Sequence, residues 1–363
     1  MENAEPMNSK LIFRPAEYEY VQTLSKFDID GKPVTLKYEC DFQNIGKRWK
    51  GTYGFIGMNV ERTGILAHGM NTEGLTVGAM TLLETQYQEI PNITDENIIS
   101  YPYLVIWILS QYRTCDEVKN NLHKELVINP YIDVPEGLLF HFPVNDSFGG
   151  SIVIEFIGGK MTISDNTNVG VLTNDPSLEW QLTNLNCYDG VTPVNAIPFE
   201  GTNFSTASGS QGTGFANLPG SSTPPDRFVR AAMMTNYSYP VSSTERATTL
   251  AFHILNTVDI PLGTSRTDIA ANSANNKSDF TQWIVVANLK DRIYSVRMYD
   301  SPQVFSVDLC KLDLKGLQDV LYEIPVEITS TSLTQMINQK TLKQNPCISE
   351  ILNKQTQSQI AAL

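Results

Sequence analysis

The serines, histidines and cysteines of the chain lack the spacing of the common catalytic motifs. No Gly-x-Ser-x-Gly sequence is present, which excludes the nucleophile elbow of an α/β-hydrolase. The five cysteines include no Cys-x-x-Cys pair, and this argues against a structural zinc site or a thioredoxin-like site. The four histidines show no His-Glu-x-x-His or other metal-binding spacing and no tight sequence cluster with carboxylates: His68, His123, His141 and His253. We therefore expect no metal and no cofactor.

Five short segments, spread over most of the chain, form a more specific pattern than any of these single motifs. In chain order they are residues 53–58 (YGFIGM), 69–75 (GMNTEGL), 172–185 (LTNDPSLEWQLTNL), 218–228 (LPGSSTPPDRF) and 252–255 (FHIL). In this order and at these separations they resemble the choloylglycine hydrolase family, which includes bile salt hydrolases and penicillin V acylases. The resemblance covers residues 1–325, which is nearly everything except the polar C-terminal tail of residues 326–363.

The resemblance implies a particular kind of catalyst. Members of this family are N-terminal-nucleophile (Ntn) hydrolases, in which a cysteine becomes the first residue after processing. Its thiol attacks a linear amide and its own α-amine serves as the base, so that one residue holds both roles and no histidine is needed.

Two residues match the family's catalytic positions within intact motifs. Asn174 matches the asparagine whose side-chain amide donates to the tetrahedral oxyanion. Without this role it would be a turn residue before Asp175-Pro176, which is a common place for asparagine. Arg227 matches the arginine that lies in the site and holds the surroundings of the nucleophile electrostatically. Otherwise it would be a surface charge on a helix.

Two further positions depart from the family pattern. Where the family places a second residue of the oxyanion site, often Asn or Tyr, this chain offers only Thr81 or the apolar Leu82. We expect these two residues to contact substrate. His68 stands where the family usually has Asp before the Gly-Met-Asn motif.

The first residues of the sequence bear on the nucleophile. Met1-Glu2 matches the family's R-T-M-[DE]-[FW] segment, whose acidic residue hydrogen-bonds near the free amine of the nucleophile. By this match Glu2 is a catalytic-site residue, and otherwise it is a solvated charge at a frayed terminus. If the match holds, the nucleophilic cysteine and its strand lie upstream of Met1, and the domain over residues 1–325 is truncated at its N-terminus.

The elements that must position these residues can be read from periodicity and turn signals. The expected strands are residues 10–13, 64–67, 75–80 and 169–173, with hairpins over 151–163 and 282–298. Three helices are expected. The first covers residues 100–118 with Ser100 as its cap, the second begins near residue 223, and the third begins at a Ser242-x-x-Glu245 capping box. Because hairpins outnumber β-α-β crossovers, the fold class should be α+β with mainly antiparallel sheets. This agrees with the four-layer αββα sandwich of the Ntn-hydrolase fold that the resemblance implies.

Composition bounds the partners and the location of the protein. The chain has 26 basic and 39 acidic residues, and a net charge of −13 argues against nucleic-acid binding, which needs a dense basic surface. Its longest apolar run, residues 103–109, is far shorter than the roughly 20 residues that span a bilayer, so no membrane association is expected. The acidic start shows no signal peptide, which indicates a cytoplasmic protein. A signal peptide upstream of Met1 would instead make it periplasmic or secreted.

Together these features predict a hydrolase of linear amide C–N bonds that acts on small molecules. By resemblance the substrates would be conjugated bile salts, penicillin V or N-acyl homoserine lactones. The chain as written is expected to be inactive because the N-terminal cysteine is absent. The alternative is a degenerate, non-catalytic family member that acts as a binding or structural protein. Homotetramers are usual in the family, so a homo-oligomer is the expected partnership.

Overall fold

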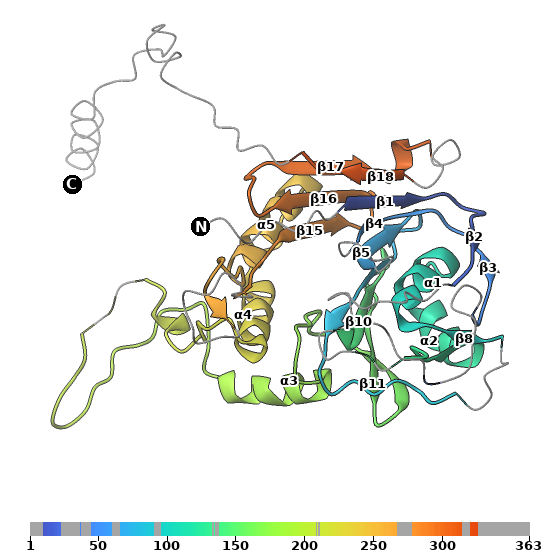
Figure 1. Ribbon diagram of the computed structural model, residues 1–363. Coiled ribbons are helices and arrows are strands. Elements are labelled where there is room, and N and C mark those ends of the chain that lie inside the picture. The colour runs from blue at the N-terminus through green and yellow to red at the C-terminus, as the bar shows by residue number, and fades with distance from the viewer. Residues whose placement is uncertain are drawn as a thin grey trace, which may run out of the picture. The chain divides into compact units, whose positions relative to one another are not determined.

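The computed structural model divides the chain into two compact units, Met1–Pro325 and Val326–Leu363. The residues that it describes all lie in the first unit: 10–22, 37, 45–59, 66–90, 96–132, 134, 138–207, 209, 211–266, 278–313 and 320–325. Within this unit helices and two main sheets form layers in the order α, β, β, α (Figure 1). The predicted α+β class and the four-layer sandwich are confirmed.

The larger sheet is antiparallel in every pair that the described residues form. Its path is β12-β11-β10-β6-β5-β4-β1-β18, and β7 also pairs with β10. The strands are β1 (Lys10–Arg14), β4 (Phe55–Asn59), β5 (Leu66–Asn71), β6 (Thr76–Gly78), β7 (Met80–Thr81), β10 (Phe140–Asn145), β11 (Ser151–Ile157), β12 (Lys160–Asp165) and β18 (Val320–Glu323). The predicted strand 10–13 and the hairpin 151–163 are confirmed. The predicted strand 75–80 is present as β6 and β7, without Leu75 and with a break at Ala79. Of the predicted strand 64–67, residues 66 and 67 lie in β5, whereas residues 64 and 65 lie outside the described part.

The smaller sheet has three strands, β15 (Trp283–Asn288), β16 (Ile293–Met298) and β17 (Val304–Asp308). Alternate residues of β16, among them Tyr294 and Val296, face the larger sheet and pack against Ile56, Met58 and Met70. This apolar layer, buried between the two sheets, follows from the period-two alternation of strands. The predicted hairpin 282–298 is confirmed.

Helices α1 (Leu104–Gln111) and α2 (Cys115–Glu125) cover the outer face of the larger sheet. The aromatic side chains of Phe140, Phe142 and Phe156 point from β10 and β11 into the same core as these helices. Smaller two-stranded elements border this layer: β2 (Glu19–Tyr20) with β3 (Trp49–Lys50), and the parallel pair β8 (Ile98–Ile99) with β9 (Val127–Ile128).

The single helix predicted over residues 100–118 is wrong, because the segment is two helices with a break between them. Asn71 Nδ2 donates to the carbonyls of Leu109 and Tyr112 at 2.9 and 2.7 Å, and the chain leaves the helix at Tyr112. Thr114 then begins α2, since its hydroxyl accepts from Glu117 N. Ser100, the predicted cap, makes no capping bond with its side chain.

Helices α3 (Leu178–Leu185), α4 (Pro224–Tyr237) and α5 (Thr244–Asn256) lie on the opposite side of the sandwich (Figure 1). Val153 on β11, Leu178 and Phe228 form a small buried cluster that joins the larger sheet to α3 and α4. Helix α5 is capped by Ser243, one residue after the predicted Ser242. It packs beside β15, and the short pair β13 (Ser265–Arg266) and β14 (Ser278–Asp279) follows it.

The strand predicted at residues 169–173 is also wrong. The segment runs outside both sheets, because its backbone groups bond to a local turn and to side chains instead of a neighbouring strand. The N–H groups of Val169 and Gly170 both donate to the carbonyl of Asn166. Asn166 Nδ2 donates to the carbonyl of Val171 at 3.0 Å, and His141 Nε2 lies 2.8 Å from the carbonyl oxygen of Thr173. This departure from sheet structure turns the chain toward α4 and presents Asn174 there.

Candidate functional site

Asn174 lies in the short segment between β12 and α3, and two contacts orient its side-chain amide. Arg227 Nη2 donates to Asn174 Oδ1 at 2.7 Å, and Asn174 Nδ2 donates to the carbonyl oxygen of Thr81 at 3.2 Å. A guanidinium can only donate and a carbonyl can only accept, so these partners determine which end of the amide is which. The second hydrogen on Nδ2 has no acceptor among the described residues. The amide is therefore held as a preorganised donor.

Thr81 and Leu82, the two residues expected to contact substrate, are placed differently. Thr81 ends β7, pairs with Phe140 of β10, and is partly exposed. The Leu82 side chain is completely buried, and its backbone N–H donates to Leu139 at 2.8 Å. Of the two side chains, only that of Thr81 reaches the surface beside Asn174.

Arg227 enters the site from the first turn of α4. Its Nε donates to the carbonyl of Ser222 at 3.0 Å, so that two nitrogens of the guanidinium are held at once. No carboxylate of the described residues pairs with it. Burial, together with the nearby charge of Arg230, lowers the pKa of Arg227, but an arginine keeps its charge at any physiological pH. Asn174 therefore has a fixed positive charge beside its oxygen.

Side chains tie the segment around Asn174 to the loop that follows β7. Leu83 N donates to a carboxylate oxygen of Asp175, and Ser177 N donates to Glu84 Oε1 at 2.8 Å. The buried side chain of Gln181 donates from α3 to the carbonyl of Asp175 at 3.1 Å. These contacts make the two loops one unit, which fixes the distance between Asn174 and Thr81.

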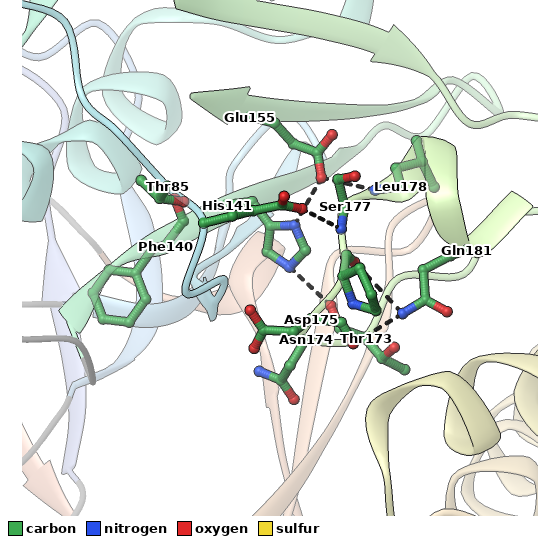
Figure 2. Close-up of polar contacts among 12 residues, drawn as sticks. Thr85, Phe140, His141, Glu155, Thr173, Asn174, Asp175, Ser177, Leu178 and Gln181 are labelled. Atoms are coloured by element: carbon green, nitrogen blue, oxygen red, sulfur yellow. Dashed lines mark hydrogen bonds and ion pairs between the residues drawn. The ribbon is translucent and has the colours of Figure 1, made fainter. Parts of the chain in front are cut away.

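A buried histidine–carboxylate pair lies directly behind this unit (Figure 2). His141 Nδ1 is 3.1 Å from Glu155 Oε1, and the same oxygen accepts from Leu178 N at 2.9 Å. No tight sequence cluster of histidines with carboxylates marks this pair. The two residues are 14 positions apart but face each other across the β10–β11 hairpin, one step beyond the pair Phe142–Ile154. Hairpin register counted from the turn at 146–150 is the signal that finds them.

Comparison with known proteins shows the family of the chain. The model of the linear amide C–N hydrolases, choloylglycine hydrolase family, matches residues 7–323. The chain belongs to this family. It is 30% identical over 296 residues to the bile salt hydrolase/transferase of Clostridium perfringens, covering 80% of this chain and 87% of that protein. It is 26% identical over 300 residues to the penicillin V acylase of Pectobacterium atrosepticum, covering 77% of this chain and 73% of that protein.

Solved structures of choloylglycine hydrolase relatives have the same fold. A variant of the conjugated bile acid hydrolase from Clostridium perfringens superposes with a TM-score of 0.73 at 27% identity, covering 92% of this chain and 94% of that one. Penicillin V acylase from Agrobacterium tumefaciens superposes with a TM-score of 0.63 at 21% identity, covering 87% and 82%. The Ntn-hydrolase sandwich predicted from the sequence is therefore confirmed.

The structure brings Asn174, Arg227 and Thr81 together, whereas Glu2 lies outside the described residues. None of the described cysteines contacts this group. Cys115 is buried at the start of α2, where its N–H donates to Asp146, and Cys187 and Cys310 are exposed. Cys40 and Cys347 lie outside the described part. Within the described residues no group of three or more His, Cys, Asp or Glu side chains could hold a metal ion, and no helix is long and apolar enough to cross a membrane.

His68, which stands at the family's usual Asp position, joins the two sheets. Its Nδ1 is 3.0 Å from the hydroxyl of Tyr294 on β16. Burial lowers the pKa of His68 to about 4, so the ring is neutral at pH 7. A neutral, hydrogen-bonded imidazole of this kind stabilises the sandwich and does not supply the charge of an aspartate.

Proposed function

We propose that this chain is built to hydrolyse the C–N bond of small linear amides of the bile salt or penicillin V type. The observation that carries the proposal is the amide of Asn174, fixed between Arg227 and the Thr81 carbonyl with one N–H to spare. Hydrolysis of an amide passes through a tetrahedral oxyanion, and donors already aimed at that oxygen are the largest single source of catalysis in many enzymes. The relatives named bile salt hydrolase and penicillin V acylase support the substrate class.

Each partner of Asn174 has a physical role in this proposal. The bond to Thr81 uses one hydrogen of Nδ2 and fixes the plane of the amide, which leaves the other hydrogen for the oxyanion. The charge of Arg227 against Oδ1 polarises the amide and strengthens the remaining N–H as a donor. The hydroxyl of Thr81, a partly exposed residue, is the candidate for a second donor.

The nucleophile of the proposed reaction is a cysteine thiol with a free α-amine, as the family resemblance implies. Cys115, Cys187 and Cys310, the cysteines among the described residues, do not contact Asn174 or Arg227. We therefore propose that turnover requires a cysteine at the N-terminus, as in a chain extended upstream to an in-frame cysteine. The attacking sulfur would form a thioester and release the amine, and water would then release the acid.

Expression of two proteins tests the proposal: the 363-residue chain and a chain extended to the first in-frame upstream cysteine. Both are assayed on glycocholate and penicillin V by release of glycine or 6-aminopenicillanic acid. Turnover by the extended chain alone supports the proposal. Equal turnover by both proteins would remove the N-terminal cysteine from the mechanism.

The alternative, a non-catalytic binding protein, predicts a different result in the same experiment. Glycocholate would then bind to either chain in a calorimeter with no release of glycine. A stop codon or unrelated sequence immediately upstream of the Met1 codon would favour this alternative.

We further propose that the protein self-associates. Large apolar side chains are exposed in the loop between α3 and α4: Val194, Ile197, Phe199 and Phe204 are 54–92% accessible. Exposed apolar groups gathered in one loop are typical of a protein contact surface. Light scattering after size exclusion tests this. Self-association is supported if the wild type has a mass of two or more times 40.5 kDa and F199E/F204E has the mass of one chain. A monomeric wild type contradicts it.

A further inference from the structure

The His141–Glu155 pair is buried on the face of the larger sheet that is turned toward α3 (Figure 2). His141 is 0% and Glu155 4% exposed, so neither side chain can contact a substrate. Neighbours on the same strands, Phe142 and Phe156, point to the opposite face and pack in the α1–α2 core. Two ionisable side chains in such a place need a structural or positional reason, because buried charges are costly unless they are paired.

The hydrogen bonds of the pair require an additional proton. Nε2 of His141 lies 2.8 Å from the carbonyl oxygen of Thr173, which can only accept, so Nε2 carries a hydrogen. A neutral ring would then present the lone pair of Nδ1 to Glu155 Oε1 at 3.1 Å, and two acceptors would face each other. Oε1 already accepts from Leu178 N, as an ionised carboxylate does. The arrangement is therefore an imidazolium–carboxylate pair with both ring nitrogens protonated.

The pair holds the two ends of the segment that carries Asn174. His141 binds the carbonyl of Thr173, the residue just before Asn174, and Glu155 binds the N–H of Leu178, the first residue of α3. Thr173 is also held by its hydroxyl, which donates to the carbonyl of Pro224 at the start of α4. One buried unit thus sets the position of Asn174 relative to Arg227.

We propose that His141 and Glu155 form a proton-holding pair that positions Asn174, so that the function of the oxyanion donor depends on the protonation of a buried histidine. This inference rests on the proposed amide hydrolysis. Neither side chain touches Asn174 or the reacting atoms, and both are positioning residues. Loss of the proton leaves two opposed lone pairs at Nδ1 and Oε1, which weakens the contacts at both ends of the segment.

The other titratable groups around the pair are engaged elsewhere. Glu84 in the loop after β7 accepts from Ser177 N, and Asp175 accepts from Leu83 N. Tyr87 accepts from the N–H of Phe140 through its hydroxyl, and burial raises its pKa well above 10. Arg227 on α4 donates to Asn174 and Ser222. Glu155 is thus the carboxylate that faces His141 among the described residues.

The first test measures the proton directly on the 363-residue chain and needs no turnover. Long-range ¹H–¹⁵N spectra report the protonation of each imidazole, and H141N identifies the His141 signals by their loss. We expect both nitrogens of His141 to be protonated at pH 7, and the ring of His123, which is exposed on α2, provides a comparison signal in the same spectrum. A ring of His141 with a single protonated nitrogen at pH 7 overturns the proposal.

The second test separates positioning from simple stabilisation. In H141N the shorter amide still reaches Glu155 but not Thr173, and we expect kcat of the extended chain to fall about 10²-fold with little change in KM. In the double variant H141Q/E155Q one amide can donate to Thr173 and the other can accept from Leu178 without any ionisable group. We expect this double variant to recover most of kcat and to lack the pH dependence of kcat that the ionisable pair is proposed to give the wild type. H123Q on the exposed face of α2 is the matched control.

The side-chain amide signals of Asn174 and the backbone amide of Leu178 provide a readout that does not depend on hydrolysis. We expect the chemical shifts of both groups to change in H141N and to return to their wild-type values in the double variant. If the extended chain hydrolyses neither substrate, the proposed function fails while these shifts still decide the positioning role. Unchanged Asn174 and Leu178 signals in H141N, or a double variant no better than H141N, contradict the inference.

Discussion

Arg227 donates from Nη2 to Oδ1 of Asn174 across 2.7 Å, and this contact joins the first turn of α4 to the segment that leads into α3. The two residues are 53 positions apart and come from different sequence motifs. Their contact joins the two motifs, since one supplies the side-chain amide and the other supplies the guanidinium that orients it.

Removal of the Asn174 amide should abolish most of the proposed activity. N174A deletes one oxyanion donor, and losses of such donors lower kcat about 10²–10³-fold. The measurement is steady-state kinetics of the extended chain on glycocholate and penicillin V. N120A, an asparagine exposed on α2, is the control and should leave kcat unchanged. Comparable kinetics for N174A and N120A would rule out Asn174 as the donor.

Replacement of Arg227 by lysine should weaken the site although the charge is kept. A lysine ammonium cannot reproduce the fork that binds Ser222 and Asn174 together. One charge-assisted hydrogen bond contributes about 1.5–3 kcal/mol, so kcat of R227K should fall roughly 10- to 100-fold. The exposed Arg246 on α5 allows the matched control R246K. A fall in R246K as large as in R227K would show that the effect is not local.

His68 should make the protein less stable in mild acid. Its folded pKa of about 4 lies below the unfolded value near 6.5, so between these values the unfolded chain binds more protons. Stability therefore falls as the pH falls from 6.5 toward 4, by about 1–3 kcal/mol from this residue. Urea unfolding at several pH values gives the free energy of unfolding as a function of pH. This free energy should change less with pH in H68Q than in the wild type and in H123Q. The same pH dependence of the free energy of unfolding in all three proteins would contradict the role given to His68.

The described cysteines should differ sharply in reactivity. Burial and the nearby carboxylate of Asp146 raise the pKa of the Cys115 thiol, and only the thiolate is alkylated. Cys187 and Cys310 are exposed. Brief iodoacetamide treatment followed by peptide mass spectrometry should label Cys187 and Cys310 in the folded protein and Cys115 only after unfolding. C187S/C310S should keep the turnover of the extended chain, and its loss would implicate one of these thiols in the chemistry.

Much of the fold was predictable because its signals are local. The hairpin over residues 151–163 follows from alternating residues around Gly158-Gly159, and both glycines adopt the left-handed conformation that the turn needs. The start of α4 follows from Pro224 and Pro225 behind Thr223. The motifs that contain Asn174 and Arg227 likewise make those residues candidates for the site without any knowledge of their contacts.

The predicted elements were wrong where side chains from distant parts of the sequence form hydrogen bonds with the backbone of a segment. Residues 100–118 have a helical pattern throughout, but the side chain of Asn71 on β5 donates hydrogen bonds to two backbone carbonyls at the end of α1. Residues 169–173 have the composition of a strand, but His141 and Asn166 bind their carbonyls. Propensity describes what a segment favours alone, and these side-chain contacts override it.

Periodicity, caps and motifs are properties of neighbouring residues, so the amino-acid sequence was enough to predict most of the elements, the fold class, and Asn174 and Arg227 as candidate site residues. The contacts among these residues could be seen only in the folded chain. The contact of Asn174 with Thr81 and the pairing of His141 with Glu155 depend on strand register and on a segment that leaves the sheet. Such contacts join positions 14 to 93 residues apart, and no local pattern specifies them.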